Sequence, residues 1–291
     1  MNAPPLVCTI GDLVTDVVVR LASDPQRGTD TPAQIETLRG GSAANVAVAV
    51  AAAGGQSRFV GQVGRDAAGD GLIADLAAQG VDARVAQRGE TGCVVVLVDE
   101  SGERSFLSDR GASQYLTATP EGILDGVDVL HVPMYSLAAG SLADTTQQLL
   151  GEAVERGIAV SLSTSSVSVL REYGRAQFMA LVQNLRPELI FANAAEARFL
   201  LEAHPWFTHA GATVVTAGSG RARLTRPDGT DHRVAPEKTT VLDSTGAGDA
   251  FTGGFLVAWG RGGQPEDWLS AGHALASRSL RLPGAQLADS D

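Results

Sequence analysis

Short aliphatic runs alternate with longer helical patterns through most of this 291-residue chain, and no other feature constrains its fold as strongly. Glycines such as Gly54 and Gly80 end two of the helical patterns. Such an alternation builds βαβ units, in which parallel strands are covered by helices on both faces. The sequence therefore predicts a three-layer α/β/α fold around a mostly parallel sheet.

The pattern places the expected elements along the whole chain. The expected strands are residues 6–11, 58–63, 127–132, 159–162, 189–192 and 213–216. The expected helices are residues 42–53, 67–79, 142–156, 176–184, 194–203, 246–259 and 266–282. No low-complexity linker or repeat divides them, so we expect residues 1–291 to form a single domain.

Two pairs of strand-like segments have no helix between their partners. They are residues 16–21 with 35–38, and residues 92–98 with 104–108 across a polar turn at 99–102. We expect a small antiparallel sheet that projects from the main domain as a lid over a site. Both faces of residues 92–98 are apolar, which indicates that both are covered and predicts a homodimer through the lid.

Composition excludes several classes of function. The net charge of −11 disfavours nucleic acid or an anionic membrane as a partner. Two distant cysteines, Cys8 and Cys93, form neither a disulfide framework nor a metal or redox motif. Residues 40–57 are uncharged but contain polar residues, which indicates a buried helix rather than a membrane span, and residues 1–21 lack a signal-peptide pattern. We therefore expect a cytoplasmic protein.

The most informative segment, residues 243–254, reads Asp-Ser-Thr-Gly-Ala-Gly-Asp-Ala-Phe-Thr-Gly-Gly. Small residues at a helix start let backbone N–H groups approach an anion, which the helix dipole also attracts. Asp249 follows in the first turn, where a carboxylate beside an anion suits a general base acting on a substrate hydroxyl. On spacing alone, a glycine-rich helix start with a favourable first-turn acid explains the segment equally well.

A second segment, Gly40-Gly41-Ser42-Ala43-Ala44-Asn45, places a glycine pair before an Ala-rich helix that contains a polar residue. The glycines permit a close ligand, and the Asn45 amide can both donate to and accept from a polyol. A helix cap at Ser42 is the structural alternative.

Together with Gly61-Gln62-Val63-Gly64-Arg65-Asp66, these segments resemble the paired signatures of the PfkB, or ribokinase-like, carbohydrate kinases. The resemblance covers nearly the whole chain. It implies a ribokinase-like fold and an ATP-dependent kinase that transfers the γ-phosphoryl group to a hydroxyl of a sugar. A nucleoside kinase of the same family is the alternative, and a non-catalytic sugar or nucleotide sensor on this fold is another.

The resemblance also implies roles for particular residues. Asp249 matches the catalytic base, and Gly246, Ala247 and Gly248 match the anion hole. Asp16, Gly41 and Asn45 match substrate-contacting positions. Arg110 is a further substrate candidate, because it is able to face an anionic group such as that of a sugar acid; a solvated loop residue is its alternative.

Nucleotide and metal positions follow from the same resemblance. Asn193 and Glu196 match an Asn-x-x-Glu motif associated with Mg²⁺ and phosphate, with Glu196 acting through water, although Asn and Glu at this spacing also form a capping box. Thr216, Gly218, Gly220 and His273 match nucleotide-side positions. Asp243 and Thr245 lie near a monovalent-cation loop, which makes K⁺ an additional candidate ion.

One segment departs from the family pattern. Residues 161–166, Ser-Leu-Ser-Thr-Ser-Ser, stand where many relatives have an Asp-Pro-Asn-like stretch, so a familiar acidic group is missing. The chain has no P-loop, dinucleotide fingerprint, Gly-x-Ser-x-Gly elbow or His-Glu-x-x-His motif. Aromatic residues are only 5%, and Phe106 and Tyr135 are the candidates to clamp a base, so a sugar is favoured over a nucleoside.

Overall fold

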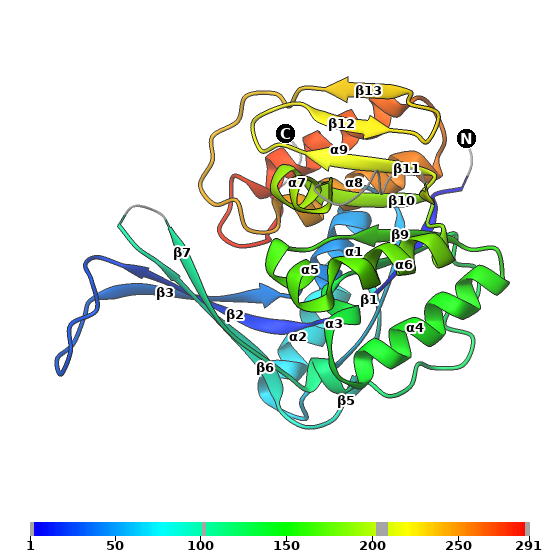
Figure 1. The fold of residues 1–291 in the computed structure, drawn as a ribbon. Helices are drawn as coiled ribbons and strands as arrows, with labels where there is room; N and C mark the ends of the chain where they lie inside the picture. The colour runs from blue at the N-terminus through cyan, green and yellow to red at the C-terminus, as the bar shows by residue number, and fades with distance from the viewer. Residues whose placement is uncertain (1–2, 101–102, 202–208, 289–291) are drawn as a thin grey trace.

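The chain folds into a nine-stranded sheet with helices on both faces, as a computed structural model describes for residues 3–100, 103–201 and 209–288 (Figure 1). The strand order is β13-β12-β11-β10-β9-β8-β1-β4-β5. Neighbours from β11 to β5 are parallel, and only β12 and β13 are antiparallel additions. The predicted mostly parallel fold is confirmed. The strands are β1 Leu6–Ile10, β4 Gln56–Val63, β5 Asp82–Gln87, β8 Val129–Pro133, β9 Ala159–Ser163, β10 Leu189–Asn193, β11 Ala212–Thr216, β12 Ala222–Thr225 and β13 Asp231–Val234.

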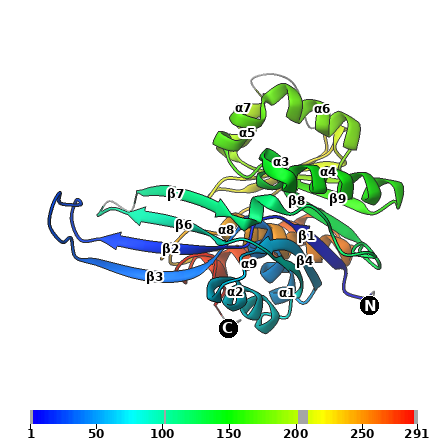
Figure 2. The ribbon, with the colours of Figure 1, turned by 90° about the horizontal axis from the view of Figure 1, so that it is seen from below.

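The helices form two layers, one on each face of this sheet (Figure 2). One layer consists of α1 Ser42–Ala52, α2 Ala67–Ala78, α8 Ala247–Gly260 and α9 Pro265–Ser279. The other consists of α3 Tyr135–Ala138, α4 Gly140–Glu155, α5 Val167–Tyr173, α6 Arg175–Leu185 and α7 Ala194–Leu201. Separate apolar clusters fill the two faces, with Phe178 in one and Phe255 in the other.

Helix α1 consists mostly of Ala and Val because it is enclosed between the sheet and α8. Every residue from 43 to 50 is buried, including the polar Asn45. Gly253 of α8 packs directly against Ala49 of α1, so the two helix backbones approach closely. This contact brings the start of α8 beside the start of α1.

A second sheet of four strands projects from the body (Figures 1 and 2). Its order is β3-β2-β6-β7, with β2 Val14–Leu21, β3 Ala33–Gly40, β6 Thr91–Val98 and β7 Arg104–Gly111. The outer pairs are antiparallel, as expected for the small projecting sheet, and the central pair of β2 and β6 is parallel. The hairpin of β2 and β3 starts just after β1, and the hairpin of β6 and β7 starts just after β5. Because β1 and β5 are parallel strands of the main sheet, β2 and β6 leave that sheet in the same direction.

Side chains alternate between the two faces of this second sheet. The strand registers place Asp16, Arg20 and Arg104 on the inner face together with the buried Val18, Val96 and Val98. The outer face carries Val17, Val19, Ile35, Val95, Leu97 and Leu107, of which Ile35 and Leu107 are 64% and 59% exposed. The chain therefore buries the central apolar residues of the inner face, although Phe106 of that face is 56% exposed, and it leaves Ile35 and Leu107 of the outer face open.

The sequence pattern does not predict β5, β12, β13 or α5. These strands are short and half-exposed, so no continuous apolar run marks them, and α5 has only seven residues. The expected helix end at residue 203 and the turn residues 101–102 lie outside the described residues. Within the described ranges, no helix combines the length and apolar character needed to cross a membrane.

Candidate active site

Six of the predicted site residues gather where β9, β10 and β11 end, beside the start of α8. A cavity of about 240 Å³ lies there, lined by Asn193, Glu196, Thr216, Gly246, Gly248 and Asp249 among others. The strand order reverses at β1, and open parallel sheets form ligand crevices at such a point. A larger cavity of about 620 Å³, between α2 and the root of the second sheet, contains none of the predicted site residues.

Asp249 lies in the first turn of α8, and α1 holds its carboxylate. Ser42 Oγ donates to Oδ1 at 2.7 Å, and Asn45 Nδ2 donates to Oδ2 at 3.0 Å. Burial raises the pKa of Asp249 to about 6, although both hydrogen bonds favour the charged form. A carboxylate with a raised pKa at the wall of a cavity is suited to accept a proton.

Gly41 and Asn45 place α1 against the site in different ways. A β-carbon at Gly41 would lie 2.1 Å from the Asp12 carbonyl oxygen, and its φ of 103° also requires glycine. Asn45 is 8% exposed, and its Oδ1 is buried without a hydrogen-bond partner. The amide of Asn45 therefore binds Asp249 on one side and has an unused acceptor on the other.

The start of α8 is open for an anion. Gly246 has a left-handed φ of 73° and packs so closely on Ala285 that a β-carbon would lie 2.3 Å from that of Ala285. No side chain caps the helix. The N–H groups of Gly248 and Asp249 have no acceptor within the helix, and both residues line the cavity. The predicted anion-binding residues thus meet the predicted base.

Asp16 lies on the inner face of β2, with its carboxylate packed against Gly40. Burial, with a smaller contribution from the charge of Asp249, raises the pKa of Asp16 to about 6, although the charge of Arg39 lowers it. Arg39 also lowers the pKa of Asp249. Its side chain is 8% exposed, and Nη1 donates to Asp75 Oδ2 at 2.6 Å. Sequence reasoning missed Arg39, because nothing in its local pattern marks it.

Asn193 and Glu196 form the capping arrangement at the start of α7. The Asn193 N–H and Nδ2 donate to Glu196 at 2.8 and 2.6 Å, and Thr164 Oγ1 donates to it at 2.5 Å. Glu196 is buried yet lines the cavity. Within the described ranges no three acidic, His or Cys side chains form a metal-binding group. The carboxylate of Glu196 at the cavity wall is chemically suited to bind the water of a Mg²⁺ ion that phosphates carry.

Hydroxyl groups line the side of the cavity that follows β9. Ser163 and Ser165 lie on the cavity, and Ser166 caps α5 by accepting from the Val169 N–H at 3.2 Å. Ser165 has a φ of 63°, an uncommon conformation for a residue other than glycine. Residues 161–166, which depart from the family pattern, therefore give this side of the cavity a neutral, hydroxyl-rich wall.

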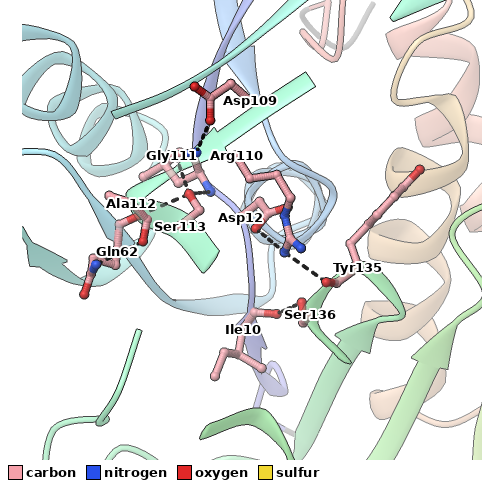
Figure 3. A network of polar contacts seen from close by, with 11 residues as sticks. Ile10, Asp12, Gln62, Asp109, Arg110, Gly111, Ala112, Ser113, Tyr135 and Ser136 are labelled. Atoms are coloured by element: carbon pink, nitrogen blue, oxygen red, sulfur yellow. Dashed lines mark hydrogen bonds and ion pairs between the residues drawn. The ribbon is translucent and has the colours of Figure 1, made fainter. Parts of the chain in front are cut away.

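Arg110 is held beside the site rather than pointed into it. Its Nε and Nη2 donate to the two carboxylate oxygens of Asp12 at 2.9 and 2.8 Å, and Nη2 also donates to the Tyr135 carbonyl at 2.9 Å (Figure 3). Burial raises the pKa of Asp12 despite this ion pair. The guanidinium links the ends of β1 and β7 to the start of α3. Its predicted contact with substrate remains a prediction.

Asp243 lies outside the cavity, in the loop before α8. Burial would raise its pKa, but the N–H groups of Thr245 and Gly284 and the charge of Arg104 together lower it. Arg20 and Arg104 both contact its carboxylate. Sequence reasoning missed both arginines, because they lie on strands far away in the chain.

The nucleotide-side predictions separate in the structure. Thr216 lines the cavity, whereas Gly218 and Gly220 lie in the turn after β11, where the Gly220 N–H donates to Ala217 O at 2.8 Å. His273 packs its ring against Phe251 and bonds to Val234 O at 3.1 Å. Burial lowers the pKa of His273, as expected for a packed, neutral side chain. The structure does not bring His273 to the cavity.

Comparisons with known proteins agree with this geometry. A family model described as pfkB family carbohydrate kinase matches residues 4–291. An ATP-dependent ribose-1-phosphate kinase of Halopiger xanaduensis is 30% identical over 299 residues, covering 97% of this chain and 94% of that protein.

Two solved structures share the fold. Adenosine kinase from Sinorhizobium meliloti has a TM-score of 0.87 and 24% identity, covering 98% of this chain and 96% of that one. A putative ribokinase II from E. coli, in complex with ATP and Mg²⁺, has a TM-score of 0.83 and 19% identity, covering 97% and 94%.

Proposed function

Since this chain belongs to the pfkB family of carbohydrate kinases, it is a phosphotransferase with an alcohol acceptor, and we propose that Asp249 is the base through which it phosphorylates a sugar hydroxyl. The observation that carries this proposal is the position of Asp249. Its carboxylate is held by Ser42 and Asn45 and has a raised pKa, and it borders the cavity beside the unbonded N–H groups of α8.

Each of the site residues has its own role in the proposed phosphoryl transfer. The carboxylate of Asp16 and the free Oδ1 of Asn45 accept hydrogen bonds from sugar hydroxyls. Asp249 accepts the proton of the attacking hydroxyl, and the N–H groups at Gly246–Gly248 stabilise the charge that develops on the transferring phosphoryl group. The neutral hydroxyl groups of Ser163 and Ser165 line the same cavity.

ATP is the proposed donor, with its phosphates over the start of α8 and near Asn193 and Thr216. The Halopiger relative is named as ATP-dependent, and the E. coli structure of this fold holds ATP and Mg²⁺. Glu196 would hold a Mg²⁺ ion through water, and such an ion would supply positive charge beside the phosphates. The second sheet closes over the site as a lid and excludes water.

A sugar is the proposed acceptor because hydroxyl-bearing side chains dominate the cavity. Ser42, Tyr135, Ser163, Ser165, Thr216 and Thr252 all line it. The shared fold of the Sinorhizobium adenosine kinase keeps a nucleoside as the second candidate. The ring of Tyr135 is the surface on which a base would stack.

We also propose a homodimer through the outer face of the lid. That face exposes Ile35 and Leu107 to solvent. Burying such a face against a second copy removes apolar surface from water.

ADP release from ATP and Mg²⁺ tests the proposed function across pentoses, hexoses, sugar acids, sugar phosphates and nucleosides. We expect turnover with one acceptor class. Asp249→Asn should lower kcat by about 10²- to 10⁴-fold while ATP binding persists. Asp144→Asn, an exposed acid of α4, is the matched control and should retain full activity. Ligand binding without turnover on any acceptor would favour the sensor.

A further inference from the structure

The lid contacts the loop that leads into the anion-binding start of α8 through two arginines. Nη1 of Arg104 lies 3.2 Å from Asp243 Oδ1, and Nη2 of Arg20 lies 3.5 Å from Asp243 Oδ2. Arg104 also donates to Thr245 Oγ1 at 2.6 Å and to Ser244 Oγ at 2.8 Å. One guanidinium therefore contacts all three residues that precede Gly246.

The carboxylate of Asp243 has little capacity left for another ligand. The N–H groups of Thr245 and Gly284 donate to it at 2.9 and 3.1 Å, and Thr245 Oγ1 donates at 2.8 Å. With the hydrogen bond from Arg20, this carboxylate accepts four hydrogen bonds, which use the roughly four lone pairs of its two oxygens, and Arg104 adds an ion pair. Asp243 is 5% exposed, so water contributes little.

This arrangement does not fit a monovalent cation at Asp243 and Thr245. A K⁺ ion needs several oxygen atoms with free lone pairs, and these oxygens already accept hydrogen bonds. Two guanidinium charges on the same buried carboxylate would also repel a third positive charge at short range. The side-chain oxygens of this loop thus already interact with the two arginines of the lid.

We propose that Arg104, assisted by Arg20, takes the place of a monovalent cation in this enzyme. It neutralises Asp243, fixes residues 243–245 and so positions the N–H groups of α8, which makes turnover independent of K⁺. Arg104 acts through the loop and is a positioning residue rather than a catalytic one. The inference rests on the proposed function, because it assigns a purpose to the loop beside that site.

Turnover in two salts tests this inference directly. The wild type is assayed in KCl and in tetramethylammonium chloride at equal ionic strength. We expect equal kcat/KM within about twofold, because the charge a cation would supply is already present. A several-fold stimulation of the wild type by K⁺ would overturn the inference.

Removing the guanidinium should create a dependence that the wild type lacks. Arg104→Ala is expected to lower kcat/KM about tenfold or more in tetramethylammonium, from the loss of charged hydrogen bonds. K⁺ should restore much of that loss. Arg223→Ala on β12, which breaks the exposed pair with Asp231 of β13, is the matched control and should have the same activity in both salts. A loss in Arg104→Ala that K⁺ does not restore would contradict the inference.

Thermal denaturation provides a readout that needs no turnover. K⁺ should raise the Tm of Arg104→Ala but not that of the wild type, because an ion that binds only the folded state stabilises it. A K⁺-dependent rise in the wild-type Tm would overturn the inference even if no acceptor were found. Should Arg104→Ala fail to fold, the two wild-type measurements still decide.

Discussion

Gly253 of α8 is in such close contact with Ala49 of α1 that a β-carbon on Gly253 would lie 2.4 Å from the β-carbon of Ala49. Asp249 lies one helical turn before Gly253, and Asn45 lies one turn before Ala49. The close approach of the two helices therefore sets the 3.0 Å hydrogen bond from Asn45 to Asp249.

Gly253→Ala should separate the two helices and move the proposed base. Overpacking of this kind costs about 1–3 kcal/mol of unfolding free energy. We expect kcat/KM to fall about tenfold or more, because a small misplacement of reacting groups is costly. Urea unfolding and steady-state kinetics measure both effects. Gly151→Ala in α4, where a β-carbon meets nothing within 4 Å, should leave activity intact and stability equal or higher.

The pH dependence of kcat/KM should have an acid limb near pH 6. Asp249 has a pKa of about 6 and must lose its proton before it can accept one from the substrate, so activity falls as the pH decreases. The pKa of Asp16 is also about 6 and is raised by the charge of Asp249, so the two carboxylates titrate as a coupled pair. A profile that stays flat down to about pH 5 would contradict Asp249 as the base.

Arg39→Met should move this acid limb to higher pH. The Arg39 charge lowers the pKa of both Asp16 and Asp249, so its loss should raise both pKa values further above 6. Activity at pH 6.5 should therefore decrease more than activity at pH 8.5. Arg84→Met, an exposed arginine paired with Asp82, is the control and should leave the profile where it is. An unchanged acid limb in Arg39→Met would show that the Arg39 charge does not alter the pKa of Asp16 or Asp249.

Asp16→Asn should weaken substrate binding and yet stabilise the fold at neutral pH. The folded-state pKa of about 6 exceeds the ordinary 3.8, so the folded wild type binds the proton more tightly and loses stability as the pH rises from about 4 to 6. The asparagine variant lacks that loss. We expect it to gain about 1–3 kcal/mol at pH 7.5, and less at pH 5. Denaturant unfolding at both pH values, with KM for the acceptor, measures the two effects.

Leu107→Asp on the outer face of the lid should convert the proposed dimer into a monomer. A carboxylate there places charge in an apolar interface, which disfavours association. Light scattering measures the mass at the working concentration. Val154→Asp, on an apolar residue of α4 that is 49% exposed, is the control and should not change the mass. A monomeric wild type would refute the interface.

The sequence predicts those parts of the molecule whose information is local. The βαβ alternation and the segments around Asn45, Glu196 and Asp249 are short patterns in which neighbouring residues specify a helix start. The parallel pairing of β2 with β6 is not local, because it depends on where both hairpins leave the main sheet. The pattern around His273 is also ambiguous, since a helical histidine packed on Phe251 looks the same in sequence as one at a ligand.

The arginines of the lid illustrate the same limit. Arg20 and Asp243 are 223 residues apart in the chain, and Arg104 and Thr245 are 141 apart. Nothing in the residues around Asp243 indicates that strands from the first half of the chain will contact it. Only the packed structure places the guanidinium groups of Arg20 and Arg104 on this carboxylate.

The hydrogen bond from Ser42 to Asp249 joins residues 207 positions apart, and this separation has a consequence during synthesis. A nascent chain emerging from the ribosome acquires β1 and α1 early, but it lacks the proposed base until α8 follows almost 200 residues later. Under the proposed function, partly made chains therefore lack the group that would activate a hydroxyl. Catalysis is among the last properties that the growing polypeptide gains.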